Sequence, residues 1–129
     1  MSEKIRELRY EHKKAEKFFA KRLAYTLGPV ELKQMMDENK VKILDVRKKE
    51  DFDASHLPSA ISMPYDILKE KISELSNDEI YVVYCYNALC HLGDRACYRL
   101  AEAEKTVMLL EGGFKSWTED FRFATVTEE

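Results

Sequence analysis

Two kinds of hydrophobic pattern alternate along this chain. Strands are predicted at residues 41–46, 60–63, 80–84 and 106–110, and the continuous apolar run at 80–84 is typical of a strand buried on both faces. Apolar side chains at spacings of three and four predict helices with one buried face at residues 30–38, 66–75 and 94–103. Residues 48–56 are polar and predict a loop or a helical turn. Strands that alternate with helices favour an α/β fold, with a parallel sheet of about five strands and helices on both faces.

Residues 3–23 predict a separate amphipathic helix, and Gly28-Pro29 ends either that helix or a short strand after it. The apolar face of the helix predicted at 3–23 is formed by Ile5, Leu8, His12, Ala15, Phe19 and Leu23. Because an isolated helix is marginal in water, we expect this face to dock on the body or on a second copy, giving a homodimer. After Trp117 the sequence becomes polar, which predicts a last helical turn and a loose tail. The expected organisation is a helical extension at 1–23, a domain at 24–120 and a tail at 121–129.

Composition and charge narrow the class of protein. The 129 residues are 45% hydrophobic and 35% charged, which is typical of a folded chain with a charged surface. No apolar run approaches the roughly 20 residues needed to cross a bilayer, and residues 1–22 are too charged for a secretory signal, so we expect a cytoplasmic location. The net charge of −3 gives no general reason to bind nucleic acid, and we expect neither nucleic acid nor a membrane as a partner, with a basic surface helix for either at residues 3–23 as the alternative. Residues 1–22, however, hold eight Lys and Arg against four Asp and Glu, a net +4, and the remainder carries −7.

The three cysteines, Cys85, Cys90 and Cys97, form an odd, clustered set that is a poor disulfide framework. Cys85 directly follows the predicted strand 80–84, and parallel sheets place their chemistry at the carboxyl ends of the strands. Cys85 is therefore the candidate nucleophile, with a small hydrophobic residue at a strand end as the alternative. Cys90 has three possible roles: a second nucleophile, a resolving thiol or a spectator. Cys97 lies on the apolar face of the next helix and is expected to be structural.

A nucleophilic Cys85 needs a lowered pKa. A free thiol has a pKa of about 8.5, and lowering it by two units takes about 2.7 kcal/mol. A helix N-terminus supplies only about 0.3–1 kcal/mol, so hydrogen bonds from loop amides are expected to supply the rest. Asp94 opposes this effect and Arg95 offsets it. The cysteines and His91 lack the Cys-x-x-Cys spacing of structural zinc sites, so we expect neither a metal nor a cofactor.

Three motifs, in order along the chain, resemble the rhodanese family of single-domain sulfurtransferases between Ala24 and Trp117. The first is Leu44-Asp45-Val46-Arg47 followed by Glu50, Phe52 and His56-Leu57-Pro58-Ser59-Ala60; the second is Val82-Val83-Tyr84-Cys85; the third is Leu110-Glu111-Gly112-Gly113-Phe114 with Trp117. Ser55 and Ser59 replace two glycines of the family pattern.

The family's active loop, Cys-x-x-Gly-x-Arg, fits this chain in two registers. Cys85 stands where the family places its catalytic cysteine, but Cys90 occupies the position of the family's arginine. Cys90-His91-Leu92-Gly93-Asp94-Arg95 matches the string but lies too close to Gly112. We favour Cys85 as the catalytic cysteine and keep Cys90 as the second candidate. The substrate-binding loop would then comprise Tyr86, Asn87, Ala88, Leu89 and His91.

The resemblance implies a sulfur relay. The Cys85 thiolate would take sulfur from thiosulfate or a protein persulfide, hold it as a persulfide and pass it to a thiol acceptor. Asp45 and Arg47 would support the loop, and His56 would hold its own turn. Two alternatives stay open: a non-catalytic rhodanese-like interaction module that docks through the basic helix, and a phosphatase or arsenate reductase, which needs an arginine to clamp an oxyanion.

Overall fold

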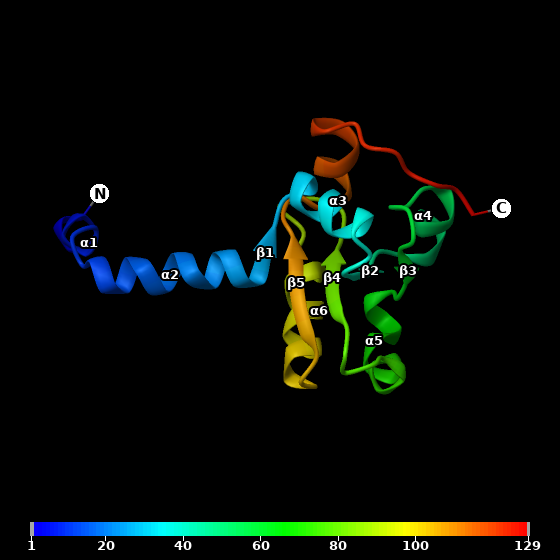
Figure 1. Ribbon diagram of the computed structural model, residues 1–129, viewed down its shortest axis with the longest axis horizontal. Helices are drawn as coiled ribbons and strands as arrows, with labels where there is room; N and C mark the ends of the chain where they lie inside the picture. Colours follow the sequence, from blue (N-terminus) through cyan, green and yellow to red (C-terminus); the bar gives the residue numbers. More distant parts are fainter. Residues whose placement is uncertain (1, 129) are drawn as a thin grey trace.

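A five-stranded parallel sheet forms the centre of the computed structural model, which describes residues 2–128 (Figure 1). The strands are β1 (Thr26–Leu27), β2 (Lys42–Asp45), β3 (Ile61–Ser62), β4 (Ile80–Tyr84) and β5 (Thr106–Leu110), in the order β1-β5-β4-β2-β3. β4 pairs with both β2 and β5, so the apolar run at residues 80–84 lies in the middle of the sheet. The predicted α/β class with a parallel sheet is confirmed.

Helices cover both faces of the sheet. One layer consists of α5 (Tyr65–Lys71), the 3₁₀ helix η1 (Ile72–Glu74) and α6 (Leu92–Glu102). The other layer consists of α3 (Pro29–Asp37), α7 (Gly113–Lys115) and the π-helical turn η2 (Ser116–Asp120). The polar stretch after β2, predicted as a loop or helical turn, forms α4 (Lys49–Ala54). Tyr81 and Val83 pack with the first layer, whereas Val82 and Tyr84 pack with the second. Cys85 continues the first series and therefore points toward α6.

The predicted N-terminal extension is helical, but residues 3–23 form two helices instead of one: α1 (Glu3–Leu8) and α2 (His12–Tyr25). The backbone leaves the helical region at Glu11, where φ is −88° and ψ is 79°. The bend brings Ile5 and Leu8 beside Ala15, Phe18 and Phe19 around one apolar hollow. In a straight helix Ile5 and Phe18 would be about 20 Å apart along the axis, so the bend is what gathers these side chains.

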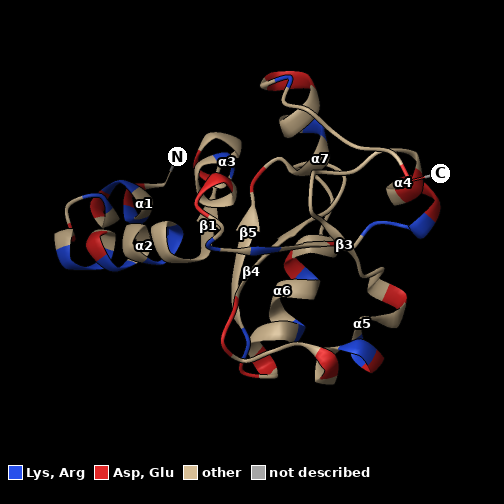
Figure 2. Cartoon of the chain, turned by 45° about the vertical axis from the view of Figure 1, so that its right-hand side comes forward, with Lys and Arg blue, Asp and Glu red and all other residues tan. Residues whose placement is uncertain are grey.

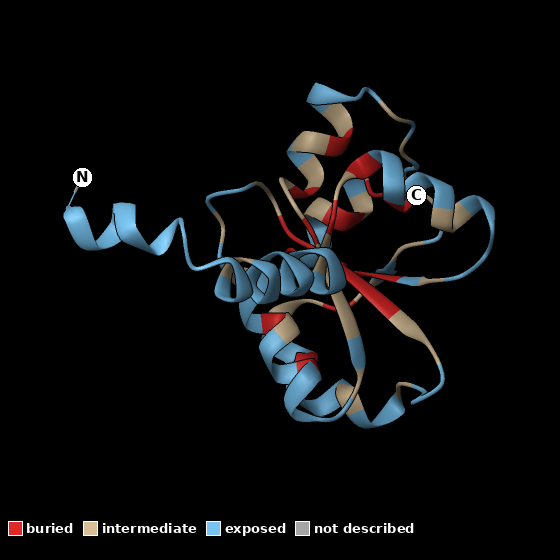
Figure 3. Cartoon of the chain, turned by 60° about the vertical axis from the view of Figure 1, so that its left-hand side comes forward, coloured by how far each residue is buried: buried red, intermediate tan, exposed pale blue. Residues whose placement is uncertain are grey.

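The arm, defined as residues 2–25, extends away from the sheet, and all of its residues except Ala15 are exposed (Figure 3). Phe18, Phe19 and Leu23 are 56%, 58% and 79% exposed. The root of the arm is held by pairing of β1 with β5 and by a 2.7 Å ion pair between Arg22 and Glu111. The apolar stripe therefore does not dock on its own body, which was one of the two expectations. No helix within residues 2–128 has the length and apolar character needed to cross a bilayer.

The C-terminal segment, expected to be loose, packs against the domain. Trp117 donates from Nε1 to the carbonyl of Ala124 at 2.9 Å, and the ring of Phe123 lies 5.0 Å from the Trp117 ring. His56 and Val126 exchange two backbone hydrogen bonds of 2.9 Å. Aromatic side chains within this polar stretch thus hold residues 121–128 along the turn that contains His56.

Candidate active site

The loop after β4 forms the wall of a surface cavity of about 320 Å³. Cys85 begins this loop, and residues 86–91 lead into α6 at Leu92. Cys85, Asn87, Ala88, Cys90 and His91 line the cavity together with side chains from the arm root, α6 and the end of β5: Arg22, Thr26, Asp94, Leu109, Leu110, Glu111 and Gly112. Both candidate cysteines therefore face one cavity.

The sulfur of Cys85 lies at the start of α6. A Cβ on Gly93, in the first turn of that helix, would be 3.4 Å from this sulfur. Backbone hydrogen bonds from Gly93 and Asn87 lower the pKa of the Cys85 thiol. Burial and a hydrogen bond with the Cys90 side chain outweigh them and raise the pKa to about 11. The resting thiol is therefore neutral at pH 7, unlike the lowered pKa expected from the sequence.

The turn at Gly112-Gly113 fixes the first two peptides of the loop. The amide of Phe114 donates to the carbonyl of Cys85, and the amide of Lys115 donates to the carbonyl of Tyr86, both at 2.9 Å. In a trans peptide the carbonyl and the next N–H point in opposite directions. Holding the Tyr86 carbonyl outward therefore turns the Asn87 amide inward, toward the sulfur. This is the structural role of the third sequence motif.

The rest of the loop is organised around Asn87. The carbonyl of Asn87 accepts from the Cys90 amide at 3.1 Å, and its Oδ1 accepts from the Leu89 amide at 2.9 Å. These two amides are thus occupied within the loop and do not face the sulfur. Cys85 itself donates from Sγ to the carbonyl of Cys90 at 3.4 Å. The expected ring of loop amides is reduced to those of Asn87 and Gly93.

Asp45 and Arg47 lie behind the loop as a buried ion pair. Arg47 donates from Nη2 to Asp45 Oδ2 at 2.8 Å, and Tyr84 donates its hydroxyl proton to the same oxygen at 2.5 Å. Burial opposes the charge on Arg47, but hydrogen bonding and attraction to Asp45 outweigh it and raise the Arg47 pKa. The guanidinium lies 4.1 Å from the centre of the Phe114 ring, which holds the Gly-Gly turn. The pair lies outside the cavity, and the Arg47 guanidinium also lies 5.7 Å from the ring centre of the loop residue Tyr86.

Tyr86 ties the loop to α4. Its hydroxyl donates to the Asp51 carboxylate and accepts from the Lys48 amide at 3.2 Å. Burial, and after it the hydrogen bond to Asp51, raise the pKa of the Tyr86 hydroxyl. The hydroxyl therefore stays protonated and continues to donate to Asp51. The hydrogen bond thus joins Asp51 of α4 to Tyr86 of the loop, 35 positions later in the sequence.

His56 is buried away from this cavity. Its Nδ1 lies 2.7 Å from the carbonyl oxygen of Leu57 and its Nε2 lies 2.8 Å from Glu128 Oε1, while the ring stacks on Phe52. Ser59, which stands where the family pattern has glycine, adopts a positive φ of 66°. Of the two serines that stand where the family pattern has glycine, Ser59 therefore has a backbone conformation that favours glycine, whereas Ser55 is extended with a φ of −171°.

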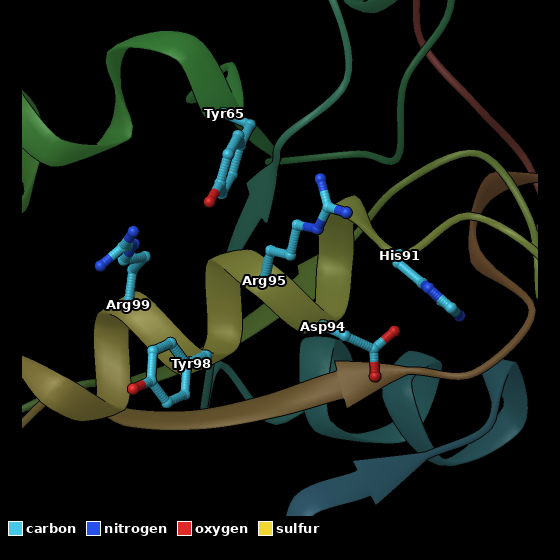
Figure 4. Close-up of a pocket in the computed structure, with 6 residues that line it drawn as sticks. All are labelled: Tyr65, His91, Asp94, Arg95, Tyr98 and Arg99. Atoms are coloured by element: carbon cyan, nitrogen blue, oxygen red, sulfur yellow. The ribbon is translucent and has the colours of Figure 1, made fainter.

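Arg95, Arg99 and Cys97 lie on other sides of α6. Figure 4 shows Arg95 and Arg99 in a second cavity, near Tyr65, which His91 and Asp94 also line. Arg95 does not line the Cys85 cavity, so it is not placed to clamp a substrate there. Burial raises the pKa of Cys97 to about 12, and its Sγ lies 3.9 Å from the carbonyl oxygen of Met108. The raised pKa keeps the Cys97 thiol protonated at pH 7.

Sequence reasoning missed Arg22 and Glu111 as cavity residues. Arg22 belongs to the arm, 63 positions before Cys85, and reaches the cavity because β1 aligns Thr26 with Leu109 of β5. No local sequence motif predicts this contact, because it depends on the pairing of the two-residue strand β1 with β5.

Comparisons with known proteins place this site in a family. The rhodanese-like domain model matches residues 28–120, so the chain belongs to the rhodanese-like domain family. An HTH-type transcriptional regulator of Mycobacterium tuberculosis is 32% identical over 67% of this chain but only 38% of its own length, so this chain spans well under half of it. The thiosulfate sulfurtransferase GlpE of Pseudomonas syringae is 26% identical over 76% of this chain and 92% of the enzyme.

Among solved structures, the BH2092 protein of Bacillus halodurans shares the fold. It aligns with a TM-score of 0.82 at 24% identity, and the alignment covers 89% of this chain and 85% of that one. Residues 28–129 make up roughly four-fifths of this chain, so the aligned part extends into the arm. Part of the arm therefore belongs to the fold that this relative shares.

Proposed function

We propose that this chain is a sulfurtransferase or persulfide carrier that acts through Cys85. The observation that carries the proposal is the position of the Cys85 sulfur. It faces a surface cavity at the end of the central strand, beneath the amides of Asn87 and Gly93. Those amides favour negative charge on the sulfur as it reacts. Family membership and the likeness to GlpE support the same class of reaction.

The reaction would proceed in two displacements. The Cys85 thiolate attacks the outer sulfur of the donor, an S–S bond forms to Cys85, and the S–S bond of the donor breaks. The bonding electron pair leaves with sulfite when thiosulfate is the donor, or with a thiolate when a persulfide is. An acceptor thiolate then attacks the terminal sulfur and Cys85 departs as a thiolate. The proton lost from Cys85 at the start goes to water.

The charges around the cavity favour a persulfide donor over thiosulfate. Arg22 is paired with Glu111 at 2.7 Å, and Asp94 also lines the cavity. The charges of Arg22, Glu111 and Asp94 together are not positive, so these side chains do not attract the thiosulfate dianion. A thiol persulfide carries one negative charge on its reacting end, which the two amides accommodate. All three cysteines are free, as this chemistry requires in a reducing compartment such as the cytoplasm.

The proposal is tested by measuring sulfur transfer to a thiol acceptor from glutathione persulfide and from thiosulfate. We expect turnover with the wild-type chain, faster with the persulfide, and none with Cys85→Ser. Activity that survives in Cys85→Ser but disappears in Cys90→Ser would transfer the catalytic role to Cys90. Activity that survives in both variants would contradict the proposal.

A non-catalytic interaction module is the second candidate, and the raised Cys85 pKa favours it. A module of this kind needs no thiolate and would give no turnover with either donor. A phosphatase or arsenate reductase is less well supported, because Arg22, the arginine that lines the cavity, is already paired with Glu111.

A further inference from the structure

The arm carries a concentrated set of exposed apolar side chains. Among the described residues, seven of the large exposed hydrophobic side chains belong to it: Ile5, Leu8, Tyr10, Phe18, Phe19, Leu23 and Tyr25. Neither α1 nor α2 has a buried residue. Two short helices without buried side chains are marginal in water, and monomers rarely expose a contiguous patch of this kind. The arm therefore needs a surface to cover it.

An apolar groove of about 650 Å³ lies at the root of the arm. It is open because β1 pairs with Leu109 and Leu110 of β5, which leaves the edge of Thr106–Met108 without a strand on that side. Its lining includes Ala24, Tyr25, Cys97, Tyr98, Ala101 and Met108, and Tyr98 is 65% exposed.

We propose that a second copy of this chain covers the arm, and that the arm of each protomer lies in the groove at the root of its partner's arm. The charge distribution favours this occupant. Residues 1–22 carry +4 and the rest of the chain carries −7, so the arm of one copy is attracted to the body of another (Figure 2). The acidic body would be repelled by an anionic membrane or nucleic acid.

The geometry allows two protomers to place their arms in each other's grooves at the same time. The groove begins at Ala24 and Tyr25, so each arm leaves its own domain beside the groove that its partner would fill. A twofold axis between the two roots then makes both contacts equivalent, which is the usual form of a homodimer. α2 alone is about 21 Å long, enough to reach across a neighbouring helix and strand. The contact would also hold Arg22, which lines the active-site cavity, in a fixed position.

Light scattering coupled to size exclusion tests the proposal on the full chain. We expect twice the chain mass of 15.1 kDa for the wild type, and the monomer mass for Phe18→Glu/Phe19→Glu on the arm and for Tyr98→Glu in the groove. Val30→Glu, at an exposed apolar position of α3 outside the arm, is the control and should stay dimeric. Unchanged circular dichroism would show that the monomeric variants are folded.

Salt distinguishes the proposed contact from its rivals. A basic arm on an acidic body loses affinity as NaCl rises, because screening weakens the attraction. A dimer that tightens with salt and survives Tyr98→Glu would show that the two arms pair with each other instead, which overturns the proposal. A monomeric wild type at high micromolar concentration would also overturn it, as would a monomer that sediments with vesicles of anionic phospholipid.

Discussion

Gly113 lies so close to Cys85 that a Cβ at position 113 would stand 2.6 Å from the carbonyl oxygen of Cys85. This approach allows the Phe114 amide to reach that carbonyl at 2.9 Å. Gly113 also has a positive φ of 57°, which favours glycine. The Gly-Gly motif thus acts on the candidate nucleophile through the backbone of the loop.

Gly113→Ala should therefore destabilise the chain by about 1–3 kcal/mol, from the positive φ and the contact with Cys85, and should slow sulfur loading. Gly28→Ala is the matched control, because a Cβ there meets nothing within 4 Å and φ is −98°. Thermal unfolding and the loading rate measure the two effects. A Gly113→Ala chain as stable and reactive as the control would show that the turn does not position the loop.

The pKa of about 11 at Cys85 predicts a steep pH dependence. A raised thiol pKa means that the reactive thiolate is scarce at pH 7 and grows about tenfold per pH unit until pH nears the pKa. Alkylation of Cys85 by iodoacetamide, followed by peptide mass spectrometry, should therefore keep accelerating from pH 7 to pH 10. A rate that levels off near neutrality would show that the loop stabilises the thiolate in the resting protein.

Cys90→Ala should speed the alkylation of Cys85. The Cys90 side chain is the second contribution, after burial, to the raised Cys85 pKa, so removing its thiol lowers that pKa. Cys97→Ala provides a comparison, because Cys97 does not line the cavity that holds Cys85 and Cys90. The measurement is the same alkylation assay at pH 8. Equal rates in all three chains would contradict the hydrogen bond between the two thiols.

Removing Arg47 should cost far more stability than removing an exposed lysine. Arg47→Ala leaves the fully buried Asp45 carboxylate without its partner, which costs about 3–5 kcal/mol. Lys49→Ala removes an exposed ion pair with Asp53 and should cost at most about 1 kcal/mol. Urea unfolding of both variants gives the comparison. Similar losses would mean that the buried pair is not a structural support.

The strands β4 and β5 could be predicted from the sequence because burial on both faces favours a run of apolar residues. Residues 80–84 and 106–110 form β4 and β5 with the predicted bounds. The place of Cys85 at a strand end followed from the same pattern. The bend at Glu11 could not be predicted, because helical spacing continues across it, and what favours the bend is contact between side chains brought together from both helices.

Properties that depend on tertiary contacts also escaped prediction. The raised pKa of Cys85 arises from burial and from Cys90, while the loop amides of Leu89 and Cys90 bind Asn87 instead of the sulfur. Arg22 joins the cavity through strand pairing alone. Sequence motifs identified Cys85 as the candidate nucleophile, whereas its environment required the structure.

The most direct test of sulfur transfer is the intact mass of the chain after incubation with glutathione persulfide and removal of excess donor. We expect a gain of about 32 Da, reversed by dithiothreitol, mapped to the peptide that contains Cys85, and absent from Cys85→Ser. Cys97→Ser, which alters a cysteine outside the cavity, should still gain the sulfur. A wild-type chain that gains no mass, or gains it equally in Cys85→Ser, would contradict the central claim that Cys85 carries the sulfur.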